Sequence, residues 1–253
     1  MFLGGLEIIV NKIAEKIFNS GKVVDERGVE YDIHSNTSLE QCEYLQSLVE
    51  EIDAARCLEV GLAYGMSSLF ICEAIQEKQD SVFYSIDPQQ DWWKDIGLKN
   101  LMDSGCSKFL KFHRDYSHTI LPELLAKDTE LDFAYVDTTK VFDVVLVDIY
   151  YLIRMLRTGG ILVLDDCDFP GLNKLARYLS KMPNLEVHSL HGSYQCSRIR
   201  RLFARLLKKI PFADSIFSDK ALYSDCSLGV NARCIAFRKL SNDERRWDWN
   251  VSF

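Results

Sequence analysis

The stretch from Cys57 to Ser68 constrains the fold of this chain more than any other. Apart from Glu59, its first residues are apolar and predict a buried strand, after which Gly61 and Gly65 predict a tight turn into a helix. A second apolar segment follows and ends in Asp87, 22 positions after Gly65. A strand, a glycine turn, a helix and a second strand that ends in an acid are typical of an open α/β sheet with a ligand across its strand ends.

The spacing of the glycines selects among the ligands that such a turn can hold. A dinucleotide-binding turn has the form G-x-G-x-x-G, but Ala63 and Met66 stand where its later glycines would be. We therefore expect a poor fit for a pyrophosphate at the helix N-terminus. Gly61 would let the backbone approach a ligand closely, and the Asp87 carboxylate could accept both hydroxyls of a ribose, which favours an adenosine-containing cofactor. The alternative is that the turn only packs the strand against the helix.

Strand-like and helix-like apolar segments alternate over most of the chain. This alternation predicts a Rossmann-like α/β fold, doubly wound, with a mostly parallel seven-stranded sheet and helices on both faces. A weaker strand is expected at 184–190, and a last strand at 232–239 closes the sheet. The other strands are predicted near 56–61, 81–87, 108–113, 131–137 and 160–166, and the helices between them over 66–78, 95–104, 117–127, 141–157 and 171–182.

The chain is expected to form a single domain. At its N-terminus, one helix is predicted over 3–19 and a second from the capping residue Ser38 to about Ile52. Later, 198–209 has the pattern of a basic amphipathic helix, which could cover the strand ends or contact a membrane or an anionic group. The predicted segments are an N-terminal helical extension at 1–54, a cofactor-binding core at 55–190, an insertion or lid at 191–229, and a closing strand and tail at 230–253.

Composition argues against several classes of function. A net charge of -7 and a pI near 5.3 make nucleic acid an unexpected partner. No apolar run reaches the roughly 18 residues that span a bilayer, and no signal peptide is recognisable, so we expect a cytoplasmic protein.

The eight cysteines are scattered without C-x-x-C pairs, which indicates reduced thiols rather than a disulfide framework or a zinc site. Pairing of subunits as a homodimer, through the N-terminal helix and the aromatic tail, stays open.

Acidic residues end two more of the predicted strands. Asp137 ends the fourth, and Asp165 and Asp166 end the fifth, so all three should lie on the ligand side of a parallel sheet. Three converging carboxylates need a cation to stay ionised, and oxygen ligands favour Mg²⁺ over zinc. Lys140 begins the next helix, where a cation and partial desolvation would lower its pKa and let it take a proton from a substrate hydroxyl. The alternatives are helix N-caps for the acids and a solvated lysine.

These motifs resemble those of known methyltransferases. The form Gly61-x-x-x-Gly65-x-Ser67 is similar to motif I of class I S-adenosylmethionine (SAM)-dependent methyltransferases, and 38–190 resembles the small cation-dependent O-methyltransferases. Asp137-Thr-Thr-Lys140 is similar to the Asp-x-x-Lys element of that group, and Asp165-Asp166 matches its later pair. The resemblance implies that the three acids hold a metal ion and that the lysine is the base.

A bacterial family of class I methyltransferases, the methyltransferase type 24 domain family, is closer still, and the likeness covers nearly the whole chain. The family usually has Asp-Gly-x-His where this chain has Asp137-Thr138-Thr139-Lys140, a departure that leaves open a lysine base, a different acceptor or weakened activity. The shared motifs are Ile86-Asp-Pro-x-Gln90, Gly97-Leu-x-Asn100, the segment Leu121 to Leu124, Phe142-Asp-x-Val-Leu-Val-Asp148, and the Trp-x-Trp ending at Trp247 and Trp249.

The same resemblance implies a set of cofactor contacts. Asp115 and Tyr116 follow the third strand, where the adenine ring is held, and Ser67 with Ser38 or Thr37 would meet the methionine carboxylate of SAM. Helix N-termini favour carboxylates, so this part of the implied set agrees with helix electrostatics. The full implied set is Ser38, Glu59, Gly61, Tyr64, Gly65, Ser67, Asp87, Asp115, Tyr116 and Asp137.

The sequence therefore predicts a SAM-dependent methyltransferase that acts on a small-molecule or sugar hydroxyl with the help of Mg²⁺. An NAD-linked oxidoreductase is one alternative, and the missing third glycine argues against it. A non-catalytic SAM-binding protein is the other, in which Thr138 and Lys140 would mark lost catalysis. If Lys140 is not the base, the alternatives are His34, His118, His191 or an unassisted metal-bound alkoxide.

Overall fold

The computed structural model describes residues 12–35, 37–195 and 219–251, together with 197, 199, 202, 206–207, 210, 212 and 216–217. The chain divides into two compact units, Met1–Ile120 and Leu121–Phe253, and each is taken by itself. The division leaves the predicted single-domain arrangement a prediction.

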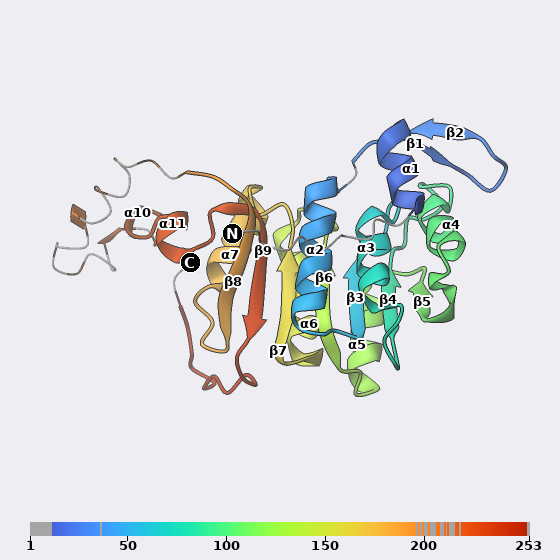
Figure 1. The fold of residues 1–253 in the computed structure, drawn as a ribbon. Coiled ribbons are helices and arrows are strands. Elements are labelled where there is room, and N and C mark those ends of the chain that lie inside the picture. The colour runs from blue at the N-terminus through green and yellow to red at the C-terminus, as the bar shows by residue number, and fades with distance from the viewer. Residues whose placement is uncertain are drawn as a thin grey trace, which may run out of the picture. The chain divides into compact units, whose positions relative to one another are not determined.

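Three parallel strands of the main sheet lie in the first unit. These strands are β3 (Arg56–Val60), β4 (Val82–Ile86) and β5 (Leu110–His113). β4 pairs in parallel with both β3 and β5, so it is the middle strand of the three (Figure 1). The unit's helices are α1 (Lys12–Ser20), α2 (Leu39–Glu51), α3 (Met66–Ile75), α4 (Ile96–Asp103) and a 3-10 turn at Cys106–Lys108, and α5 (Ser117–Ala126) begins at its end.

Helix α2 begins where the sequence predicts it. The Ser38 side chain accepts a hydrogen bond from the backbone N–H of Gln41 at 3.3 Å, which satisfies one of the free donors of the first turn. The buried face of α2 packs against α3, whose first turn follows the glycine turn. The predicted helix from Ser38 to about Ile52 is confirmed.

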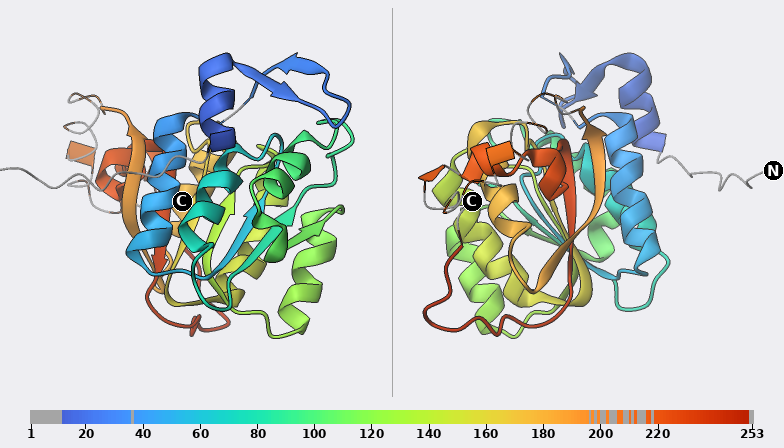
Figure 2. Two further views of the ribbon diagram at one scale, coloured as in Figure 1. Left: turned by 45° about the vertical axis from the view of Figure 1, so that its right-hand side comes forward. Right: turned by 90° about the vertical axis from the view of Figure 1, so that its left-hand side faces the viewer.

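The second unit contains the other four strands of the main sheet. β6 (Leu131–Val136) pairs in parallel with β7 (Leu156–Leu164), and β9 (Ala232–Lys239) runs antiparallel to both β7 and β8 (Leu185–Ser193). Strands β8 and β9 lie side by side in the views of Figure 1 and Figure 2. The unit's longer helices are α6 (Phe142–Met155) and α7 (Pro170–Leu179), and α10 (Asp219–Leu222) and α11 (Asp225–Leu228) are single turns.

The full strand order of the main sheet is β5-β4-β3-β6-β7-β9-β8. The predicted α/β fold with a mostly parallel seven-stranded sheet is therefore confirmed. All six residues of β6 are buried, as expected for a strand that is covered on both faces. No helix in the described parts of the chain is long and apolar enough to cross a membrane.

The structure corrects two element boundaries. The segment between the two predicted N-terminal helices, for which the sequence indicates no regular element, forms a two-stranded antiparallel sheet, β1 (Lys22–Val24) with β2 (Glu30–Asp32). The three-residue strands are too short to give a periodic signal, and the turn depends on local bonding, because Asp25 Oδ1 accepts the N–H groups of Arg27 and Val29 at 2.9 Å. Strand β7 also begins four residues earlier than the predicted 160, directly after α6.

The thiols are mostly as predicted, with one exception. Six cysteines are free and buried, namely Cys42, Cys57, Cys72, Cys106, Cys167 and Cys234. Cys226 is disulfide-bonded, so the expectation of reduced thiols is wrong at that position. A disulfide depends on which thiols the fold brings together, and scattered positions in a sequence do not reveal that. The predicted helix at 198–209 and the start of the one at 3–19 lie largely outside the described residues.

Candidate active site

The glycine turn after β3 has the conformation that its sequence predicts. Gly61 and Gly65 have φ of 98° and 76°, in the left-handed region that favours glycine. Gly65 caps α3 without any side-chain hydrogen bond, so the first N–H groups of that helix have no capping side chain. A Cβ on Gly97 of α4 would lie 2.2 Å from the carbonyl oxygen of Ala63, so only glycine lets α4 approach the turn this closely.

Asp87 sits beside this turn and holds it in place. Its Oδ2 accepts hydrogen bonds from the N–H groups of Leu62 at 3.2 Å and Ala63 at 3.0 Å, and from Gln90 Nε2 at 2.8 Å. Its Oδ1 accepts the N–H of Gln89 at 2.7 Å, and the residue is only 4 % exposed. Oδ2 is therefore committed to the turn, and Oδ1 is the oxygen with acceptor capacity left for a ribose.

Glu59 and Ser67, two of the implied cofactor contacts, bind each other. Glu59 is completely buried in β3, and its carboxylate accepts short hydrogen bonds from the hydroxyls of Ser67 and Ser68. These bonds tie the strand to the first turn of α3. The Ser67 hydroxyl is thus engaged within the protein, so a ligand carboxylate would have to meet the backbone N–H groups at this helix start.

Aromatic rings surround Tyr64, which lies within the glycine turn. The Tyr64 hydroxyl and His34 Nε2 lie 3.0 Å apart, and the Trp93 ring packs edge-on against Tyr64 at a centroid distance of 4.9 Å. Burial raises the pKa of Tyr64, so its hydroxyl stays neutral over the physiological range. His34 follows β2, so the N-terminal extension contacts the turn through this pair.

The two residues predicted to hold the adenine ring lie after β5. Asp115 Oδ1 accepts the N–H of Tyr116 at 2.7 Å, and the Tyr116 ring is 56 % exposed and stacked on His118 at 5.3 Å. An exposed ring is able to stack on an adenine ring. The contact of these two residues with adenine stays a prediction. Ser38 is exposed and accepts the helix-capping bond described above.

In the second unit, three acids converge as the sequence predicts. β6 and β7 pair in parallel with Val136 opposite Leu164, so the residues that follow them come to the same edge. Asp137, Asp165 and Asp166 each offer a carboxylate oxygen, and these oxygens lie within 4.8 Å of one another. We call these three residues the acid cluster. A set of oxygen donors this close has the chemistry that a hard divalent cation prefers.

Two cationic side chains pair with the acid cluster. Lys140 Nζ lies 3.0 Å from Asp137 Oδ1 and makes a second, shorter ion pair with Asp166. Arg233 Nη2 lies 3.0 Å from Asp166 Oδ1, and its Nε lies 3.7 Å from Asp165 Oδ1. Three carboxylates and two cations leave one net negative charge. Lys140 therefore lies against the acid cluster rather than in bulk solvent, and its role as the base stays a prediction.

The predicted fall of the Lys140 pKa applies beside a bound cation, and without one the direction is the opposite. Burial alone would lower it, but the charges and hydrogen bonds of Asp137 and Asp166 outweigh burial and raise the pKa above its ordinary value. The sequence places these carboxylates near the lysine but does not show that both pair with its ammonium group. As the residues stand, Lys140 is protonated at neutral pH.

Several supporting residues were not assigned a role from the sequence. Gln90 Nε2 donates to Ala63 O at 2.9 Å, and Asn100 Nδ2 donates to Tyr64 O at 3.0 Å, so both brace the glycine turn. Arg233 reaches the acid cluster because β9 is antiparallel and begins where β7 ends, as the Cys167 N–H bond to Arg233 O at 2.7 Å shows. An arginine directly before the apolar run that begins at Cys234 was the available signal.

Known proteins are similar to this chain in sequence. A methyltransferase domain model matches residues 58–167, a range that includes both the glycine turn and the acid cluster. A caffeoyl-CoA O-methyltransferase from Populus kitakamiensis is 31% identical over 133 residues, which are 51% of this chain and 54% of that protein. The chain thus spans about half the length of this curated relative.

Solved structures are similar over more of the chain. The O-methyltransferase TomG from Streptomyces achromogenes, in complex with SAM, has a TM-score of 0.60 against this chain at 15% identity. The match covers 95% of this chain and 92% of the TomG chain. An O-methyltransferase from Bacillus cereus, in complex with SAH, has a TM-score of 0.59 against this chain at 14% identity. The match covers 72% of this chain and 85% of the Bacillus cereus chain. At these identities the likeness supports the fold, and the sequence match is to a methyltransferase domain over residues 58–167.

Proposed function

We propose that this chain is a SAM-dependent O-methyltransferase that methylates a hydroxyl of a small molecule or sugar. The observation that carries the proposal is the acid cluster with Lys140, inside a segment that matches a methyltransferase domain. Such a set of charged groups suits the control of a hydroxyl proton. The O-methyltransferases named above support the choice of oxygen as the methyl acceptor.

The first unit supplies the groups that fit the cofactor. The uncapped N-terminus of α3, directly after the glycine turn, suits the methionine carboxylate. Asp87 Oδ1 would accept a ribose hydroxyl, while Oδ2 keeps the turn rigid. Tyr116 offers an exposed ring for stacking on adenine.

The second unit supplies the groups that fit the acceptor. When bound, SAM provides an activated methyl group, and a divalent cation provides charge that lowers the pKa of a coordinated hydroxyl. Asp137, Asp165 and Asp166 would hold such a cation, because their oxygens are its preferred ligands and the cluster keeps a net negative charge. Lys140 would receive the hydroxyl proton at Nζ, which requires that Nζ first gives up its own proton.

Cofactor binding is the most direct test of the proposal. We expect calorimetry to detect binding of SAM and of S-adenosylhomocysteine (SAH), and no binding of NAD at the same concentrations. Transfer of a labelled methyl group to a mixture of phenols, catechols and sugars would then identify the acceptor class. Binding of NAD instead of SAM would favour the oxidoreductase alternative. Tight SAM binding without transfer to any acceptor would favour the non-catalytic alternative.

The cation has its own test. We expect Asp137→Asn to weaken binding of Mn²⁺, used as a probe for Mg²⁺, by about tenfold or more, because it removes a charged oxygen ligand. Arg233→Gln should strengthen it, because it removes a competing positive charge. Asp143→Asn, an exposed acid on α6 outside the acid cluster, is the matched control and should leave affinity unchanged. Equal affinity in all variants, or methyl transfer that survives exhaustive chelation, would contradict the role of the cation.

A further inference from the structure

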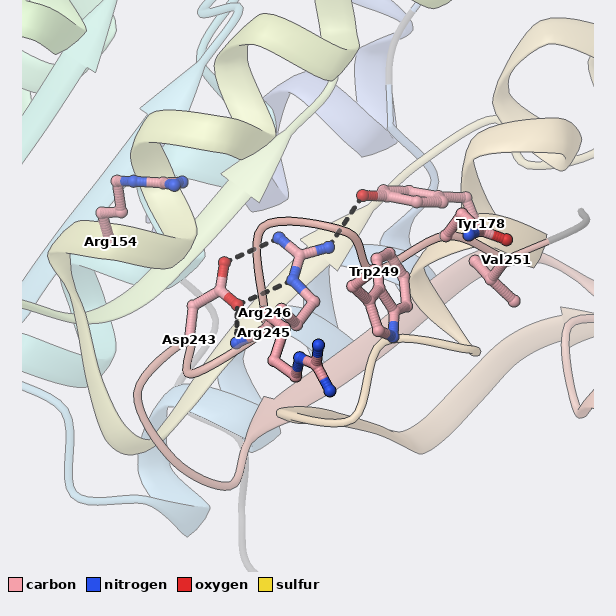
Figure 3. Close-up of a pocket in the computed structure, with 8 residues that line it drawn as sticks. Arg154, Tyr178, Asp243, Arg245, Arg246, Trp249 and Val251 are labelled. Carbon is pink, nitrogen blue, oxygen red and sulfur yellow. Dashed lines mark hydrogen bonds and ion pairs between the residues drawn. The ribbon is translucent and has the colours of Figure 1, made fainter.

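A pocket of about 580 Å³ lies in the second unit, formed where the chain after β9 contacts the ends of α6 and α7. Its wall includes Arg154 of α6, Tyr178 of α7, and Arg245, Arg246 and Trp249 of the tail. Figure 3 shows Arg154 and Tyr178 on opposite sides of the ion pair between Asp243 and Arg245. The volume is within the range of small-molecule sites in proteins.

The centre of this wall is rigidly built. Arg245 Nε and Nη2 bind the two oxygens of Asp243 at 2.7 and 2.6 Å, and its Nη1 donates to the Tyr178 hydroxyl at 2.9 Å. The same guanidinium lies over the Trp249 ring at 4.6 Å from its centroid, and the Trp249 ring contacts Tyr178 edge-on. These contacts fix the tail against α7 and hold the indole ring as one side of the pocket.

Two other arginines keep donors available. Arg154 donates one N–H to the carbonyl oxygen of Tyr150 at 2.8 Å and stacks on that residue's ring, which leaves its other N–H groups without a partner among the described residues. Arg246 is 80 % exposed and pairs only with Asp248, at 3.1 Å, within the described part of the chain. Guanidinium groups with open N–H donors recognise phosphate and carboxylate oxygens well.

The charge around the pocket is opposite to that of the whole chain. Three arginines line it; Arg245 is paired with Asp243 and Arg246 with Asp248, so the group keeps one net positive charge although the chain carries a net charge of -7. The positive field also acts on the buried Lys239, whose pKa is lowered first by burial and then by Arg154. A small positive pocket on an acidic protein concentrates anions locally.

We propose that this pocket binds the phosphate group of a small molecule. Arg154 and Arg246 donate to the phosphoryl oxygens, the ion pair of Arg245 with Asp243 holds the wall in place, and Trp249 provides a flat apolar surface for the organic part. The pocket is distinct from the acid cluster, because Arg154 precedes the first residue of β7 and Asp165 follows its last. A strand of nine residues places its ends roughly 26 Å apart.

Calorimetry with inorganic phosphate on the full chain tests the proposal, with acetate as the carboxylate probe. We expect saturable phosphate binding near one equivalent, with a Kd on the order of 1 mM, and at least about tenfold weaker binding of acetate. Arg154→Gln and Arg246→Gln should each weaken phosphate binding by about fivefold or more. Lys127→Gln removes the same charge from an exposed position outside the pocket and should leave the affinity within about twofold of the wild type.

Three outcomes would overturn the proposal. They are the absence of saturable phosphate binding, equal binding of acetate, and a loss in Lys127→Gln that matches the loss in the arginine variants. Because both arginine changes are at exposed side chains, the thermal unfolding midpoint should stay close to that of the wild type. Trp249→Phe gives a second measurement, since phosphate should change the tryptophan fluorescence of the wild type and change it less in this variant. SAM binding and methyl transfer play no part in these measurements, so this proposal and the proposed function can fail separately.

Discussion

Replacing Lys140 by alanine should lower the rate of methyl transfer by roughly a hundredfold or more and leave SAM affinity nearly unchanged. The physical reason is that Lys140 Nζ is the basic group nearest the acid cluster that can also lose its proton, since Arg233 stays protonated. General base catalysis by a positioned side chain contributes about 10²- to 10⁴-fold. Single-turnover transfer from pre-bound SAM measures the chemical step without substrate binding or product release.

The dependence of the methyl-transfer rate on pH distinguishes two roles for Lys140, a general base and a fixed positive charge. The neighbouring carboxylates raise the Lys140 pKa, so the neutral amine is the minor form at physiological pH and its fraction grows about tenfold per pH unit. If Lys140 is the base, the wild-type rate should rise with pH up to the pKa of Lys140 in the cation-bound enzyme and level off above it. If its ammonium form holds the acceptor oxygen instead, the rate should fall as pH rises through the same range.

Lys140→Arg provides the matched control. A guanidinium keeps the positive charge and the ion pairs but cannot give up its proton, so it should not rescue a lost base. Substantial rescue by arginine, together with a rate that falls at high pH, would show that the charge is what matters. Equal single-turnover rates in the wild type and in Lys140→Ala would remove the residue from the chemistry and direct attention to His34, His118 or His191.

The sequence predicted the parts of the fold that repeat a simple physical pattern. The strands around the glycine turn and the acid ends of β6 and β7 follow from apolar runs that stop at polar residues, and parallel pairing then brings Asp137, Asp165 and Asp166 to one edge. The ends of strands and the turn between them are local features. A single sequence is therefore sufficient to locate them.

The parts that the sequence did not predict depend on contacts between distant segments. Arg233 meets Asp166 only because β9 is antiparallel, and no local pattern reports that direction. The raised pKa of Lys140 depends on two carboxylates at once, one of them 26 positions away in the sequence. The use of Asp87 Oδ2 by the glycine turn is of the same kind, since a predicted ligand contact turned out also to be a structural support.

Asp87 is both a support of the glycine turn and the expected acceptor of the ribose hydroxyls, so replacing it should affect stability and cofactor affinity. We expect Asp87→Ala to weaken SAH binding by tenfold or more, because it removes a charged acceptor for the ribose hydroxyls, and such bonds are worth roughly 1.5–3 kcal/mol each. The same change leaves the N–H groups of Leu62 and Ala63 without their acceptor, at a cost of about 1–3 kcal/mol for each buried donor. Chemical unfolding should therefore show a loss of stability beside the loss of affinity.

Gln90→Leu separates the two roles. The Gln90 amide donates to Asp87 Oδ2 and to Ala63 O, so this change loosens the turn from the same side but keeps the carboxylate. Affinity for SAH should fall less in Gln90→Leu than in Asp87→Ala, even where the two variants lose similar stability. A ribose contact also requires that the 2′-deoxy analogue of SAH binds the wild type more weakly than SAH does, and that this difference shrinks in Asp87→Ala, as in a double-mutant cycle. If the difference between SAH and its analogue is the same in both proteins, Asp87 acts on the cofactor only through the turn.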